Sequence, residues 1–436
     1  MHAPYTGVRF MMRPNGRAFK DERVTIMAFG LTKKELSWVL YDVGNSAFVM
    51  LSTALIPVYF ASIADPGSSV VVAWGYAETV ASLVLALLMP VLGSLADLAG
   101  NKKKFLVGFA GTGAVACAAL GIPEHALSFL VVYVIAAIML NGSMVFYDAF
   151  LVDATTEERY DKVSSHGYAW GYIGSCIPFI ACLAVVLGGS SFGIDAKLGM
   201  KIAFIITAAW WVVFTVPVAK NVKQLHGKKR SDHVLRTTIS GLKGTVKSIV
   251  KDKRLLFFML AFFFYIDGVH TVIKMSTSYG TDLGIDSTQL VLALLVTQFV
   301  AFPSAIAYGN LAKRFGTKRM LKVGVLAYFF IVLFAAFFLK SAVEFWILAI
   351  CVGLFQGGIQ ALSRSEYGKL IPKERANEYY GFFDIFGKYA AVMGTFLVSA
   401  FTQLTGSSSL GVLSIALLFI VGYLFLRAMP PMLGDS

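Results

Sequence analysis

The stretch GSLADLAGNKKK, from Gly93 to Lys104, decides the fold because it returns in altered form as GNLAKRFGTKRM, from Gly309 to Met320. The two copies lie 216 residues apart (309 − 93), about half of the chain. Both stand between long apolar segments, so they are expected to belong to membrane-embedded halves. The same offset relates further positions: Gly142 to Gly358, Glu158-Arg159 to Glu374-Arg375, and Gly171 to Gly387.

The composition indicates that lipid is the main solvent of this chain. Of its 436 residues, 57% are hydrophobic and 14% are charged, whereas a soluble protein carries roughly 25% charged residues. About twelve apolar segments are long enough to span a bilayer as helices. We therefore predict an all-α membrane protein, with spans near 36–62, 70–92, 104–122, 126–150, 166–188, 200–219, 255–280, 288–311, 321–339, 342–366, 379–403 and 410–428.

These spans divide the chain into two six-helix bundles, 33–219 and 255–429, with end segments at 1–32 and 430–436. Between the bundles, residues 220–254 hold eleven Lys and Arg but two Asp. We interpret this segment as a basic cytoplasmic linker with a short helix on anionic headgroups, rather than a site for nucleic acid or a partner. The stretch that begins at Met27 would make a natural start, so the first 26 residues are expected to be an extension or a misassigned start.

Basic residues are unevenly distributed between the predicted loops, and this fixes the expected orientation. One set of loops is rich in Lys and Arg, as at Lys102–Lys104 and Lys313–Arg319, whereas the other set holds only Lys197, Lys201 and Lys340. Cytoplasmic loops carry the excess of positive charge. We therefore expect an integral protein of the plasma (inner) membrane with both termini in the cytoplasm.

Several other classes of function are disfavoured. The net charge of +13 would indicate nucleic-acid binding in a soluble protein, but here membrane topology explains it. The four Cys lie in apolar segments without metal-ligand spacing, and no phosphate-binding P-loop or HExxH stretch is present. We therefore expect no enzyme activity, cofactor, metal or nucleic-acid partner.

The repeated loops have the chemistry of a conformational latch. Gly residues let two helix ends approach closely, and a carboxylate such as Asp97 can cap a neighbouring helix or pair with a cation. A contact that exists in one conformation and breaks in the other biases a two-state equilibrium. Because Lys313 stands at the position of Asp97 in the second copy, we expect a stronger latch in the N-terminal half. The alternative is that Asp97 only caps a helix.

The two loops resemble the signature of the major facilitator superfamily, Gly-x-Leu-Ala-Asp-x-x-Gly followed by basic residues. Four more stretches resemble the bacterial branch of the vacuolar amino-acid effluxer family of autophagy: 36–48, 147–174, 265–271 and 355–372, where QGGIQALSRS is the most specific run. The resemblance implies a major facilitator fold and transport, with a hint of amino acids. It also implies that the first, fourth, seventh and tenth spans line a central cavity.

Polar side chains share helix faces in those spans. Ionisable residues within membrane spans usually face a cavity or a partner and lie along the path of the substrate or ion. Trp74, Glu78 and Ser82 share a face of the second span in the same way. Candidates for substrate binding or proton coupling are Asn45, Asn141, Asp267, His270, Lys274, Gln356 and Gln360. Candidates for gating are Asp42, Asp97, Lys102, Lys103, Asp148, Arg364, Asp384 and Lys388.

We therefore predict a secondary transporter that moves a small polar solute across the bilayer by alternating access. Amino-acid efflux is the leading hypothesis, with Asp267 and His270 as the proton-coupling pair. The nearest alternative is uptake or exchange of another metabolite, such as a sugar or nucleoside. A receptor or scaffold that does not transport is a remote alternative.

Overall fold

The structure is a computed structural model that describes residues 28–64, 70–228 and 234–431. Most of the end segment 1–32 and the proposed start at Met27 lie outside this described part. The first half contains α1 (Lys33–Ala54), α2 (Ile56–Ile63), α3 (Val70–Ala96), α4 (Lys102–Ala119), α5 (Ala126–Ala149), α6 (Leu151–Ala154), α7 (Tyr160–Gly188) and α8 (Ala196–Asn221). The second contains α10 (Lys253–Asp282), α11 (Ser287–Phe315), α12 (Thr317–Phe338), α13 (Ala342–Leu370), α14 (Ala376–Thr405), α15 (Ser408–Ser414) and α16 (Ala416–Ala428). Helix α9 (Val234–Lys251) lies between them.

The predicted fold class is confirmed. Nine helical segments of the described chain are long and apolar enough to cross a membrane, and the pair α1 and α2, bent by 44°, makes a tenth. Helix α4 packs beside α5 and α8, and α14 packs beside α10 and α15, which completes two groups of six spans. The described residues contain no strand; one isolated bridge joins Leu98 to Lys228.

Local chemistry explains where the spans begin and break. Helix α1 begins at Lys33, before the predicted residue 36, because Thr32 and Glu35 form a capping box. The first span then breaks at Leu55, since Pro57 cannot donate a backbone hydrogen bond to the preceding turn. Helix α10 begins at Lys253 because the side chain of Asp252 accepts hydrogen bonds from the first free backbone N–H groups.

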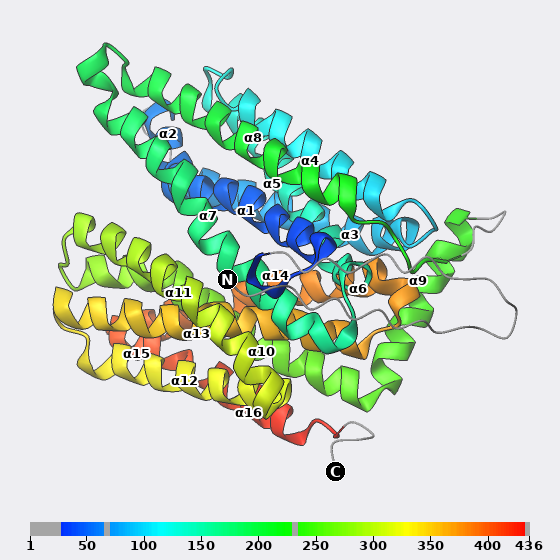
Figure 1. The fold of residues 1–436 in the computed structure, drawn as a ribbon. Coiled ribbons are helices and arrows are strands. Elements are labelled where there is room, and N and C mark those ends of the chain that lie inside the picture. Colours follow the sequence, from blue (N-terminus) through cyan, green and yellow to red (C-terminus); the bar gives the residue numbers. More distant parts are fainter. Residues whose placement is uncertain (1–27, 65–69, 229–233, 432–436) are drawn as a thin grey trace, which may run out of the picture.

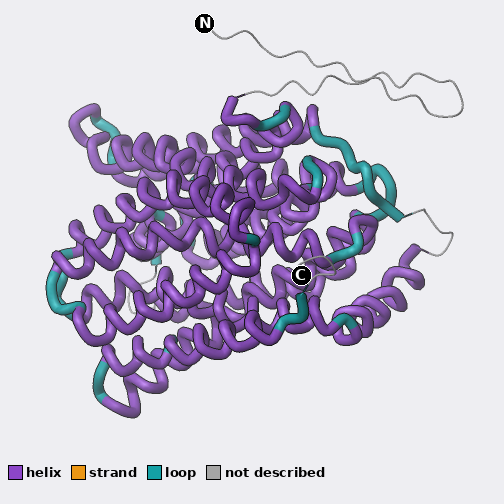
Figure 2. Tube along the Cα trace, turned by 60° about the horizontal axis from the view of Figure 1, so that its bottom comes forward, coloured by secondary structure: helices purple, strands orange, loops and turns teal. Residues whose placement is uncertain are grey.

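The two groups of helices meet at one end of the bundle and diverge toward the other. Figure 1 shows α1 to α8 in the upper group and most of α10 to α16 in the lower group, with α9 beside the end where they meet. We call this end, which carries Lys102–Lys104 and Lys313–Arg319, the basic end, and the opposite end the far end. Figure 2 shows that loops gather mainly at the ends of the bundle.

Candidate functional site

The side chain of Arg364, on α13 of the second half, is inserted into the first half near the basic end. Its exposed fraction is 1%, and Nη1 lies 2.9 Å from Oδ1 of Asp148 and 3.5 Å from Oδ2 of Asp42. Nε and Nη2 donate to Oγ and the carbonyl of Ser164, each over 2.9 Å. A Cβ at Gly167 would lie 2.8 Å from Nη2, so the absence of a side chain there makes room for the guanidinium.

Aromatic rings surround the same guanidinium. Its central carbon lies 4.4 Å from the ring centroid of Tyr168, 4.7 Å from that of Trp38 and 5.3 Å from that of Tyr147. Tyr147 also donates its hydroxyl to Oδ2 of Asp42 over 3.0 Å. Cation–π contacts and charge-assisted hydrogen bonds both strengthen when water is excluded. The helices α1, α5, α7 and α13 are therefore joined through one buried cation, which we call the Arg364 bridge.

A second contact between the halves is made by Asp97, directly after α3. Its Oδ1 accepts hydrogen bonds from the backbone N–H (2.9 Å) and the side-chain amide (2.8 Å) of Asn377, and its Oδ2 accepts one from the backbone N–H of Glu378 (3.0 Å). These groups lie in the first turn of α14, where free N–H groups and the helix dipole favour an anion. Burial raises the pKa of Asp97 to about 6, and Lys102 and the backbone N–H of Asn377 act in the opposite direction. The predicted helix-capping contact is present, and it crosses between the halves.

A third contact is centred on Asp161, in the first turn of α7. Its carboxylate accepts hydrogen bonds from Oγ1 of Thr317 (2.7 Å), Nζ of Lys369 (2.8 Å) and the hydroxyl of Ser365. Gly309 approaches the same turn, since a Cβ there would lie 3.1 Å from the carbonyl oxygen of Asp161. The second copy of the repeated motif therefore also stands at a junction between the halves.

The linker adds a fourth contact, through the buried carboxylate of Glu378. Lys228 lies 2.6 Å from its Oε2, and Arg375 lies 2.8 Å from its Oε1. Thr245, a buried residue of α9, donates its hydroxyl to Oε1. The first turn of α14 is thus held both by the first half and by the linker.

Two of the predicted gating residues are bound inside the first half instead. Lys102 forms a fully buried ion pair with Asp153, with 2.6 Å between Nζ and Oδ2. Lys103 donates to the carbonyl of Ala219 over 2.7 Å. These contacts hold the repeated loop against α6 and α8. Asp384 is half-buried on α14, and the side chain of Lys388 lies outside the described part of the chain.

The candidates for the central site are spread over several helices. Asn45 and Asn141 donate their amides to the carbonyls of Tyr41 and Ala137, one turn earlier in their own helices. Gln356 and Gln360 both donate to the hydroxyl of Tyr172 on α7, over 3.4 and 3.3 Å. This amide pair therefore contacts the opposite half, beyond the Arg364 bridge.

Asp267 is fully buried and faces α14. Its Oδ1 accepts hydrogen bonds from the backbone N–H of Gly394 (3.0 Å) and the hydroxyl of Thr271 (3.2 Å), whereas Oδ2 has no hydrogen-bond partner in the described chain. His270 is half-buried and Lys274 is exposed. A buried carboxylate with one unsatisfied oxygen suits proton binding, so the coupling role of Asp267 stays a prediction with a structural rationale.

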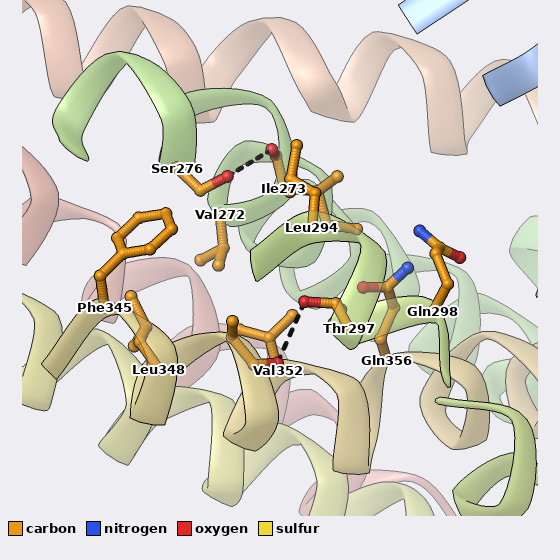
Figure 3. Close-up of a pocket in the computed structure, with 11 residues that line it drawn as sticks. Val272, Ile273, Ser276, Leu294, Thr297, Gln298, Phe345, Leu348, Val352 and Gln356 are labelled. Carbon is orange, nitrogen blue, oxygen red and sulfur yellow. Dashed lines mark hydrogen bonds between the residues drawn. The ribbon is translucent and has the colours of Figure 1, made fainter. Parts of the chain in front are cut away.

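A small pocket of about 60 Å³ lies within the second half, between α10, α11 and α13. Figure 3 shows the amides of Gln298 and Gln356 at one end and the ring of Phe345 at the other. Gln356 is the predicted central-site residue that lines it. Most of the lining is apolar: Val272, Ile273, Leu294, Phe345, Leu348, Ala349 and Val352.

Sequence reasoning missed several residues of these contacts. Ser164, Tyr168 and Asp161 of α7 and Asn377 and Glu378 of α14 were not among the candidates, although they hold the halves together. The repeat contained a usable signal, because Asp161 and Asn377 are also 216 residues apart. Equivalent positions of a duplicated bundle are expected to play equivalent structural roles.

Comparison with known proteins agrees with this geometry. Residues 68–431 match the family described as "Vacuole effluxer Atg22 like". The chain is 46% identical to the uncharacterized MFS-type transporter YxiO of Bacillus subtilis (strain 168), over 92% of this chain and 95% of that one. It is 26% identical to autophagy-related protein 22 of Cryptococcus neoformans over 60% of this chain, and it spans about half (48%) of that fungal protein.

Solved structures show the same fold at low sequence identity. The outward conformation of the major facilitator transporter FucP aligns with a TM-score of 0.70 at 14% identity, over 92% of this chain and 99% of that one. A bacterial homologue of the iron transporter ferroportin in an outward-facing state aligns with a TM-score of 0.67 at 13% identity, over 91% and 98%.

Proposed function

Because this chain belongs to the Atg22-like family of major facilitator transporters, we propose that it exports amino acids by alternating access. It is an integral membrane protein with a transporter fold and a small-molecule substrate. The proposal extends this to the class of solute, the direction and the coupling ion.

The Arg364 bridge is the observation that carries the mechanism. It joins the halves near the basic end, while the helices diverge toward the far end (Figure 1). A solute can leave through the basic end only if Arg364 separates from Asp148 and Asp42. Breaking a buried ion pair leaves charges that must be hydrated or paired again, so the bridge biases a two-state equilibrium. The described conformation is then the state closed at the basic end.

We assign the basic end to the cytoplasm of the plasma membrane because Lys and Arg are retained on that side. Both termini then lie in the cytoplasm, and the described state is closed toward the cytoplasm. The linker between residues 220 and 254 would hold the cytoplasmic ends of the bundles 33–219 and 255–429 together, as the contacts of Glu378 suggest.

Amino acids are proposed because the matched family is described as vacuole effluxers and its fungal relatives are named for autophagy. Export in the plasma membrane would move solute from the cytoplasm outward. Coupling to protons is proposed at Asp267 with His270, since a buried carboxylate and an imidazole about one turn apart on the same helix can bind and release a proton within a transport cycle.

The test is counterflow and gradient-driven uptake of labelled amino acids in proteoliposomes. We expect exchange of at least one amino acid, faster net flux with a proton gradient, and loss of the gradient effect in Asp267→Asn. Exposed Lys340, at the far end, provides the matched control Lys340→Gln. Flux of a sugar or nucleoside in place of amino acids would contradict the proposed substrate class. Ligand binding without any flux would contradict transport.

A further inference from the structure

Helix α3 has a lipid-facing side and, opposite to it, a side that faces the other half. Leu87, 76% exposed, marks the lipid side. Met89 and Gly93 mark the opposite side, because a Cβ at Gly381 of α14 would lie 3.2 Å from the carbonyl oxygen of Met89 and a Cβ at Gly93 would lie 2.6 Å from that of Asn377.

Glu78 lies on the side that faces the other half. It precedes Met89 by eleven residues, about three helical turns, and therefore has the same angular position on α3. Leu85 and Met89 on this side are buried, whereas Glu78 is exposed. Of these three residues, Glu78 is the nearest to the far end, toward which the two groups of helices diverge (Figure 1). A carboxylate in a span is costly in lipid and is tolerated toward water or a partner. Glu78 is therefore an exposed carboxylate on the side of α3 that, closer to the basic end, packs against the other half.

Aromatic side chains position this carboxylate. The hydroxyl of Tyr133, a buried residue of α5, donates a hydrogen bond to Oε1 of Glu78. The ring of Trp74, one turn before Glu78 on α3, lies 4.3 Å from the ring of Tyr133, and Phe60 packs behind Trp74 at 5.9 Å. A carboxylate beside aromatic rings is the combination that recognises an organic ammonium group, through an ion pair and cation–π contacts.

The equivalent place in the second half has different chemistry. The 216-residue offset relates Glu78 to Leu294 and Tyr133 to Ala349. Both of these residues line the largely apolar pocket of Figure 3. Among these equivalent positions, the carboxylate and the phenol therefore exist in the first half alone, whereas the second half has apolar side chains there.

We propose that Glu78, with Trp74 and Tyr133, binds the ammonium group of the transported solute. This inference rests on the proposed transport function and adds to it the group that the site recognises. Solutes with a primary ammonium group are bound, and the same carbon skeleton without that group is not.

The test uses the purified full chain and three probes that share the isobutyl chain of leucine. L-Leucine carries ammonium and carboxylate, 3-methylbutylamine only ammonium, and 4-methylpentanoate only carboxylate. We expect L-leucine and 3-methylbutylamine to raise the thermal unfolding temperature and quench tryptophan fluorescence. Longer and shorter primary alkylamines are tested in the same way. Glu78→Gln should raise their Kd at least about tenfold, as expected for loss of a charge-assisted contact. Glu78→Asp should recover part of the affinity.

Glu124, an exposed carboxylate in the loop between α4 and α5, provides the control Glu124→Gln, which should bind as the wild type does. The proposal is overturned if 4-methylpentanoate binds as well as the amine, if Glu78→Gln keeps full affinity with normal unfolding, or if no amine binds. Counterflow separates this result from the transport hypothesis. Amine binding through Glu78 without flux would refute transport alone, whereas flux that Glu78→Gln leaves intact would refute the ammonium site alone.

Discussion

The two halves meet through equivalent positions that carry opposite charges. Asp148 and Arg364 are 216 residues apart, and so are Glu157 and Lys373, whose charged atoms lie 3.3 Å from each other. Residues close to the axis that relates two copies face their own counterparts, so like charges there would repel. In this chain the equivalent residues carry opposite charges, so they attract each other. The halves therefore share a scaffold but cannot replace one another.

The two copies of the repeated motif differ in the same way. Gly93 packs against Asn377 and Gly309 packs against Asp161, and these two contacts are equivalent under the 216-residue offset. In the first junction the carboxylate is on the motif itself, at Asp97. In the second, the motif has exposed Lys313, and the carboxylate is on the opposing helix, at Asp161. The backbone approach is kept, while the charge has moved to the other partner.

The largest effect is expected from removal of the Arg364 cation, which pairs with its equivalent residue Asp148. Arg364→Met would leave buried Asp42 and partly buried Asp148 without their partner, and loss of one partner of a buried ion pair costs about 3–5 kcal/mol. We expect counterflow to fall more than 100-fold and the unfolding temperature in detergent to drop.

Exchanging the charges of Asp148 and Arg364 tests whether the ion pair itself, rather than either residue alone, is needed. The double variant Asp148→Arg with Arg364→Asp keeps one cation and one anion on the axis, so it should recover part of the unfolding temperature. Recovery should be incomplete because Ser164 and Tyr168 surround the original guanidinium. Full transport by Arg364→Met would show that the bridge is not part of the cycle.

A smaller effect is expected when the two glycine contacts are compared. In Gly93→Ala the new methyl group would lie 2.6 Å from the backbone oxygen of Asn377, whereas in Gly309→Ala it would lie 2.7 Å from side-chain atoms of Ser165. Backbone cannot yield as a side chain can, and overpacking costs about 1–3 kcal/mol. Gly93→Ala should therefore open the basic end more, as measured by the distance between spin labels at positions 104 and 319. Equal shifts in both variants would contradict this ranking.

The fold was predictable from the sequence because the signals that define it are long-range and repetitive. Spans need about 20 apolar residues, and the repeat in Gly93 and Gly309 gives the two-half organisation directly. The grouping of Asp42, Asp148 and Arg364 was also predictable, because charged residues near the ends of spans need partners. Lys102 was placed in the gate for the same reason, yet it pairs with Asp153 inside its own half.

The rest depends on how helices rotate and pack, which a single sequence does not define. Asp267 and Lys274 share a helix face in the sequence, but the structure turns Asp267 toward Gly394 and leaves Lys274 exposed. Ser164 and Tyr168 carry no charge, so no sequence pattern marks them as partners of Arg364. Only the packing of α7 against α13 brings them there.

The first junction, at Asp97, is expected to respond to pH. Burial raises the pKa of Asp97 to about 6 in the closed state, whereas exposure to water after opening would return it to about 3.9. Between these values the closed state binds more protons, so acidification from pH 7 toward pH 4.5 should favour closure. The label distance at positions 104 and 319 should shorten on acidification in the wild type. Asp97→Asn should remove that part of the pH dependence, while Lys313→Gln in the second junction should keep it.

The smallest effect is expected at the exposed pair of Glu157 and Lys373. This pair shows how much an ion pair contributes when its charges remain in contact with water. Glu157 and Lys373 have the same relation to the axis as Asp148 and Arg364, but their side chains are 42% and 37% exposed. Water and salt screen such pairs, which contribute about 0–1 kcal/mol. Lys373→Gln should therefore change the unfolding temperature and counterflow only slightly, and the change should vanish at high salt. If Lys373→Gln lowers counterflow and the unfolding temperature as much as Arg364→Met does, burial is not what makes an ion pair important. Its position between equivalent residues of the two halves would then decide its effect on opening.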